Sequence, residues 1–179
     1  MKWFLRIATL LGGLVAVAVV VLLALGQRED ANRLRASIDI AKPPSAVWPY
    51  LFQEDKLKQW VTWLVEAKPS EEPSVGRHGK WVMRDENNGG QLMTIDSVVT
   101  TAEPAKRLEV DLSVPGMFSG KGRYTLTELP NGGTRLETNQ QYDIDNWFAR
   151  LMMPVIARAA GKKAASDLAR LKQAAEKQP

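Results

Sequence analysis

The segment RLEVDLSVPGMFSGKGRYTLTELPNGGTRLETNQQY, residues 107–142, decides the fold of this chain. Its first eight residues alternate between apolar and polar side chains, which is the period-two pattern of a β-strand with one buried face. The apolar positions are Leu108, Val110, Leu112 and Val114. Pro115-Gly116 turns the chain, and residues 130–133 carry the Asn-Gly signature of a β-hairpin. The segment therefore predicts three consecutive antiparallel strands.

Further strands are predicted on the amino-terminal side of this segment. They are expected at residues 35–41, 62–67, 80–84 and 91–101, and residues 87–90 form another hairpin signal. Trp81 and Met83 share one face of their strand, opposite Lys80 and Arg84. Short helices are predicted at residues 46–52 and 54–60.

A long helix is predicted from Trp147 to about Lys177, with a kink at Pro154. A strand meander followed by one long helix must bury one face of its sheet on that helix. We therefore expect an α+β domain with a curved antiparallel sheet of about six to seven strands.

Residues 7–25 form an uncharged apolar run of 19 residues. As a helix it would cover roughly 28 Å, about the thickness of the hydrocarbon layer of a bilayer. We predict an uncleaved, single-pass anchor over residues 1–26, with a cleaved signal ending before Gln27 and a buried helix of a soluble domain as alternatives. Basic residues flank both ends of the run almost equally. The short amino-terminal tail favours a globular domain on the outer side of the cell membrane.

The anchor divides the chain into three predicted parts. Residues 27–34 read as a polar stalk, and residues 35–179 are long enough for one domain with its own core. The net charge of +4 is carried by the two ends, because residues 36–145 contain twelve basic and sixteen acidic side chains. A nucleic-acid-binding domain usually carries its basic residues on the folded body, so nucleic acid is not predicted as a partner. The basic final helix is a solvated surface or a contact for anionic lipid.

Residues suited to metal binding or nucleophilic catalysis are few. The chain has no cysteine, and His78 is its only histidine, expected to be a solvated loop residue. A metal site would need carboxylates alone, and neither a metal nor a cofactor is predicted. Glycine-rich phosphate loops and a serine nucleophile motif are absent from the sequence, so no catalytic residue is assigned.

Several phrases of the soluble part resemble the START/polyketide-cyclase-like (SRPBCC) superfamily. They are SIDIAKPPSAVWPYL at residues 37–51, Trp60, SVG at 74–76, VVTTAEPAKRL at 98–108, GKGRYTL at 120–126 and GGTRL at 132–136. The resemblance runs from about residue 35 to residue 176. It implies the helix-grip fold, in which the sheet wraps around the carboxy-terminal helix with an apolar cavity between them. Members of the superfamily bind lipids, sterols, polyketides and hormones, and a minority catalyse reactions.

Aromatic and methionine side chains suit such a cavity, because both contribute large or adaptable apolar surfaces. The predicted ligand-binding residues are Trp60, Trp81, Met83, Met93, Phe118, Tyr124, Trp147 and Met152. The favoured function is binding of a hydrophobic or amphipathic, lipid-like molecule at a membrane, without catalysis. Two alternatives stay open. One is a cyclase/dehydrase-type enzyme that uses an acid or base such as Tyr124 or Glu128. The other is an interaction module with a filled core.

Overall fold

The computed structural model describes residue 21 and residues 32–85, 89–144 and 147–177, with side chains from residue 158 onward in the last range. The predicted anchor, residues 1–26, lies outside the described residues except for Val21. Within the described ranges, no helix is both long enough and apolar enough to cross a bilayer.

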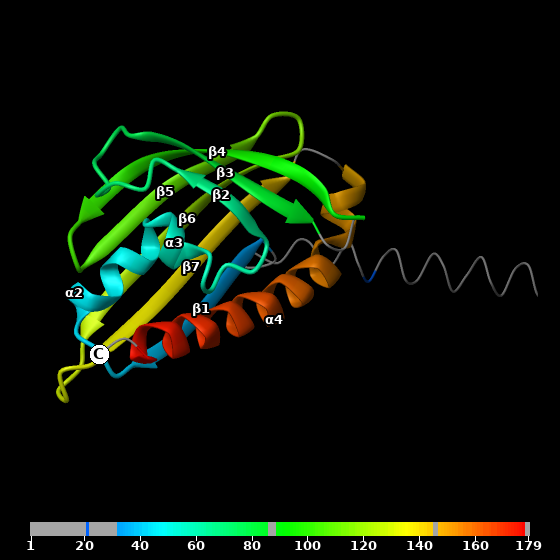
Figure 1. Ribbon diagram of the computed structural model, residues 1–179. Coiled ribbons are helices and arrows are strands. Elements are labelled where there is room, and N and C mark those ends of the chain that lie inside the picture. Colours follow the sequence, from blue (N-terminus) through cyan, green and yellow to red (C-terminus); the bar gives the residue numbers. More distant parts are fainter. Residues whose placement is uncertain (1–20, 22–31, 86–88, 145–146, 178–179) are drawn as a thin grey trace, which may run out of the picture.

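Seven strands form a single antiparallel sheet in the order β1-β7-β6-β5-β4-β3-β2. This confirms the α+β prediction (Figure 1). The strands are β1 (Arg33–Ile40), β2 (Leu64–Lys68), β3 (His78–Asp85), β4 (Gln91–Glu103), β5 (Arg107–Val114), β6 (Phe118–Glu128) and β7 (Thr134–Ile144). The hairpin between β6 and β7 turns at Gly132, whose φ of +77° is a conformation that glycine adopts without strain.

The first strand begins earlier than the sequence indicated. Arg33 and Leu34 pair with Gln141 and Gln140 of β7, so the last two residues of the predicted stalk lie within the sheet. Their alternation with the rest of β1 continues the exposed and half-buried pattern of that strand. The sheet therefore begins at Arg33, within the predicted stalk.

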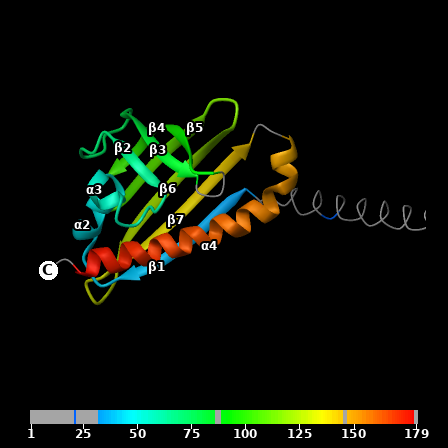
Figure 2. The ribbon, with the colours of Figure 1, turned by 45° about the vertical axis from the view of Figure 1, so that its right-hand side comes forward.

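Three short helices separate β1 from β2. They are α2 (Pro44–Val47), the 3₁₀ helix η1 (Trp48–Leu51) and α3 (Glu54–Leu57). Pro49, in the first turn of η1, prevents α2 from continuing as a regular α-helix, because proline lacks the amide donor that a longer helix requires. All three lie at the end of the sheet where the chain terminates (Figures 1 and 2).

The long helix α4 (Trp147–Lys177) runs along β1 and covers the concave face of the sheet (Figure 2). Its last turns lie beside α2, and its first turns lie at the opposite end of the sheet (Figures 1 and 2). Leu168, Leu171 and Ala175 are at most 4% exposed and pack into the hydrophobic core. The core therefore occupies the part of the helix–sheet interface nearest the short helices.

Candidate ligand-binding cavity

A cavity of about 740 Å³ lies between the sheet and the middle of α4. This is within the range of roughly 300–1,000 Å³ that is usual for small-molecule sites. Its walls come from β1, the segment before β2, the central strands and residues 159–170 of α4. The cavity lies next to the hydrophobic core on the concave side of the sheet. Leu168 belongs to both the core and the cavity wall.

The sheet side of the cavity is mainly apolar because alternate residues of neighbouring strands point to the same face. Met83 pairs with Met93 and Trp81 pairs with Ile95 across β3 and β4, and all four line the cavity. Leu112 of β5 adds to this wall. Thioether and indole groups provide an apolar surface that adapts to ligand shape.

The helix side of the cavity includes three alanines beside the longer side chains of Lys163, Asp167 and Arg170. Ala159, Ala160 and Ala164 face the open space, whereas Leu168 and Leu171 fill the interface further along α4. An alanine side chain ends at the β-carbon, so these three positions fill little of the space between α4 and the sheet. Small side chains on α4 therefore contribute to the cavity.

A polar cluster of Thr62, Lys163 and Asp167 closes the gap between α4 and the segment before β2. The Lys163 ammonium forms an ion pair with Asp167 and donates to Thr62 Oγ1 at 3.0 Å. The Thr62 hydroxyl donates to Asp167 Oδ1 at 3.2 Å. The same ammonium lies 4.7 Å from the centre of the Trp63 ring. We call Thr62, Lys163 and Asp167 the lysine cluster. It joins α4 to the sheet edge opposite β1.

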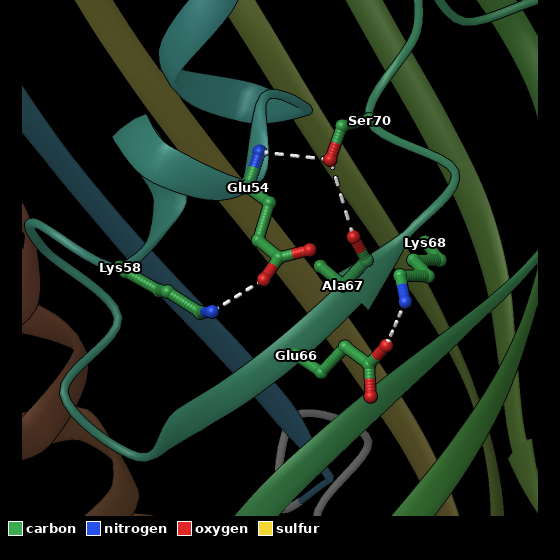
Figure 3. Close-up of polar contacts among 6 residues, drawn as sticks. All are labelled: Glu54, Lys58, Glu66, Ala67, Lys68 and Ser70. Carbon is green, nitrogen blue, oxygen red and sulfur yellow. Dashed lines mark hydrogen bonds and ion pairs between the residues drawn. The ribbon is translucent and has the colours of Figure 1, made fainter.

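Ser70 forms hydrogen bonds with residues on both sides of the segment that carries Thr62 and Trp63 (Figure 3). The Ser70 hydroxyl accepts a hydrogen bond from the Glu54 amide at 3.1 Å and donates to the Ala67 carbonyl at 3.3 Å. These two bonds tie the start of α3 to the end of β2. Lys58 pairs with Glu54 across one turn on the same side (Figure 3).

A second polar cluster lies on the sheet side, formed by Tyr124, Gln140 and Tyr142. The Tyr142 hydroxyl donates to the side-chain oxygen of Gln140, and the Gln140 side chain also hydrogen-bonds Tyr124. Gly120 pairs with Tyr142 in the register of β6 and β7. A β-carbon at Gly120 would lie only 2.9 Å from Tyr142 Cδ1, so glycine is required for this ring position. We call these three residues the tyrosine cluster.

Burial determines the ionisation of both phenols. Burial raises the pKa of Tyr124, and the hydrogen bond from Gln140 offsets part of that rise. Burial also raises the pKa of Tyr142, and the neighbouring Tyr124 raises it further. Both phenols therefore stay protonated and uncharged well above neutral pH.

Of the eight predicted ligand-binding residues, Trp60, Trp81, Met83, Met93 and Tyr124 line the cavity. Phe118 is not among the lining residues. It is the first residue of β6 and packs edge-on against Tyr142, with ring centres 5.9 Å apart. The side chains of Trp147 and Met152 lie outside the described residues.

Other residues singled out in the sequence lie away from the cavity. Glu128 is exposed. His78 is also exposed, and begins β3. Among the described residues, no group of histidine and carboxylate side chains is arranged to hold a metal ion.

Of the two polar clusters, only Tyr124 was predicted as a site residue. Lys163 and Asp167 are four residues apart on α4, a spacing that pairs side chains on one helix face and could have indicated an ion pair. Their contact with Thr62, 101 residues from Lys163, has no local signal in the sequence. Tyr142 and Gln140 belong to an alternating strand, but neither was assigned to the cavity.

Residues 32–176 match the family described as polyketide cyclase / dehydrase and lipid transport. The chain belongs to this family. The resemblance noted in the sequence is thereby confirmed for the domain, and the match covers the whole sheet and nearly all of α4. Among proteins with a curated description, none matches the chain significantly.

Solved structures with the same fold include protein NE0264 from Nitrosomonas europaea. It is 16% identical with a TM-score of 0.65, and the match covers 84% of this chain and 98% of that one. Protein CV1439 from Chromobacterium violaceum is 18% identical with a TM-score of 0.66, over 81% and 98% of the chains. DynU16, from the dynemicin biosynthetic locus, is 17% identical with a TM-score of 0.61, over 82% and 48%. At these identities the likeness concerns the fold alone.

Proposed function

We propose that this protein binds a hydrophobic or amphipathic, lipid-like molecule in the cavity between the sheet and α4, without chemical conversion. The observation that carries the proposal is the cavity of about 740 Å³ with its mainly apolar wall. Each buried methylene group contributes about 0.8 kcal/mol, so an alkyl chain gains affinity there without a charged partner. Membership of a family that includes lipid transport supports the same function.

We also propose that residues 1–26 anchor the domain to the cell membrane, with the domain on the outer side. Residues 26–31 separate the apolar run from Asn32, which lines the cavity. Even fully extended, six residues span only about 20 Å. An anchored domain would thus hold this cavity close to the bilayer, which would supply or receive the ligand.

The binding proposal is tested with the neutral fluorescent probe N-phenyl-1-naphthylamine and two tryptophan variants of β4. Met93 lines the cavity, whereas its neighbour Leu92 is 60% exposed. We expect saturable probe binding to the wild type and to Leu92→Trp. Met93→Trp should weaken binding at least tenfold by occupying the space, with a melting temperature within a few degrees of the wild type. Met83→Trp should behave like Met93→Trp.

A packed interior would give the opposite result. An added ring would then strain the structure by about 1–3 kcal/mol and lower the melting temperature clearly. Such a loss in Met93→Trp, with no saturable probe binding to the wild type, would refute the binding proposal. An interaction module with a filled core would then be the better interpretation.

The anchor proposal is tested by the intact mass of the mature protein and by membrane fractionation. We expect the full chain to stay in the membrane pellet after an alkaline wash and to retain residues 1–26. A mature species that begins at Gln27 would show that the segment is a cleaved signal.

A second candidate function is an enzyme of the cyclase/dehydrase type. It is favoured by the presence of ionisable groups in the cavity wall, namely Lys163, Asp167 and Tyr124. Against it, the functional groups of Lys163 and Asp167 already bind one another and Thr62. Mass spectrometry of ligand recovered after long incubation separates the two functions, because a binding protein returns its ligand with unchanged mass.

A further inference from the structure

The tyrosine cluster has a defined hydrogen-bond direction. Tyr142 donates to the Gln140 oxygen, so the Gln140 amide group is left to donate elsewhere. The Gln140 side chain also hydrogen-bonds Tyr124 and so holds this phenol in place at the cavity wall.

The Tyr124 side chain belongs to a residue only 9% exposed, and it lines the cavity. Its neutral hydroxyl can donate a hydrogen bond to an oxygen atom of a bound molecule. Tyr124 thus offers one uncharged donor within a mainly apolar wall.

The charges of the described cavity wall are mostly neutralised. Lys163 and Asp167 form an ion pair, and Arg170 is exposed at the edge of the cavity. A ligand carboxylate placed beside Lys163 would be attracted by the ammonium and repelled by the Asp167 carboxylate. The free-energy cost of removing the ligand carboxylate from water would then be poorly compensated. An exposed contact with Arg170 would contribute little, because solvent and salt screen ion pairs at the surface.

We propose that the cavity selects an uncharged ligand with an alcohol or carbonyl oxygen, which accepts a hydrogen bond from the Tyr124 hydroxyl. This rests on the proposed function, because it names the chemical class of the ligand for the same cavity. The lysine cluster has a structural role: it completes the cavity wall, and its charges are paired with one another and not with the ligand.

The test compares 1-decanol with decanoate at pH 7.5, where the carboxyl group is ionised and the alcohol is not. Each competes with N-phenyl-1-naphthylamine for the wild type, for Tyr124→Phe and for Tyr50→Phe. Tyr50 is a matched control because its hydroxyl donates to the Ala174 carbonyl at 3.1 Å, and the residue is not part of the cavity wall.

We expect 1-decanol to compete at least tenfold better than decanoate for the wild type. Tyr124→Phe should weaken 1-decanol about three- to tenfold, the effect of one neutral hydrogen bond, and leave the affinity of the apolar probe within about twofold. Tyr50→Phe should leave the ratio of alcohol to carboxylate unchanged.

Equal or tighter binding of decanoate would overturn the proposal, and so would an unchanged 1-decanol affinity in Tyr124→Phe. Both results leave probe binding, and hence the proposed function, intact. Failure of the wild type to bind the apolar probe is the separate result that refutes the proposed function itself, and this inference with it.

Discussion

The interface between α4 and the sheet has a packed end and an open end, which differ mainly in side-chain size. At the packed end, Leu168 and Leu171 are at most 2% exposed, and Ala175 lies among them in the core. At the open end, Ala160 and Ala164 line the cavity together with Met83 and Met93 of the sheet. Both ends belong to one continuous helix, so the change from alanine to leucine contributes to the difference in filling.

The two ends also differ in how their polar groups are placed. At the packed end, the Tyr50 hydroxyl donates to the Ala174 carbonyl and anchors the last turns of α4. At the open end, the lysine cluster joins α4 to the segment before β2, and the tyrosine cluster lies on the sheet. The comparison places the packed core at the first end and the proposed ligand site at the second.

The largest expected effect of a single substitution is at Leu171, which is fully buried. Leu171→Ala should lower the free energy of unfolding by about 2–5 kcal/mol, because it removes apolar contacts and leaves a void in a packed region. Urea denaturation of the domain from Asn32 onward measures the change. Gln173→Ala, at an exposed position of the same helix, should stay within about 0.5 kcal/mol. A loss below about 1 kcal/mol for Leu171→Ala would contradict the assignment of a packed end.

A smaller effect is expected at Asp167, whose side chain is 10% exposed. Asp167→Ala should destabilise the domain by about 1–3 kcal/mol, because it leaves Lys163 and Thr62 without their shared acceptor. Lys172→Ala disrupts an exposed pair of the same spacing on α4 and should cost about 1 kcal/mol or less. Equal effects of the two substitutions, measured by urea denaturation, would show that the lysine cluster is an ordinary surface ion pair.

The sequence predicted much of this fold because alternation and helix length are local properties. The pattern of β5, the hairpins and the long final helix gave the α+β class, and Trp81 and Met83 were placed on the face that lines the cavity. Alternation shows which side chains point inward. It does not show whether the opposite element fills the space, which depends on distant residues such as Ala164.

The polar parts of the site were harder to predict for the same reason. A lysine and an aspartate on a helix usually indicate a solvated face, yet the curvature of the sheet brings Thr62 against Lys163. The position of Tyr142 depends on Gly120 of the neighbouring strand, so neither residue alone indicates it. These contacts join residues far apart in the sequence, and only the folded chain brings them together.

The last comparison makes the same substitution, alanine to leucine, at both ends of the interface, and the smaller change in stability is expected at Ala164. Ala175 is 4% exposed within the core, so Ala175→Leu should overpack it and cost about 1–3 kcal/mol. Ala164 faces the cavity, so Ala164→Leu should change the free energy of unfolding by less than about 1 kcal/mol while it fills ligand space. The same variant should weaken N-phenyl-1-naphthylamine binding, whereas Ala165→Leu, on the exposed face of the helix, should not. An equal decrease in the free energy of unfolding for Ala164→Leu and Ala175→Leu would mean that both ends of the interface are equally packed in solution. Near-neutral stability together with lost probe binding at Ala164 alone would establish side-chain size on α4 as the feature that creates the cavity.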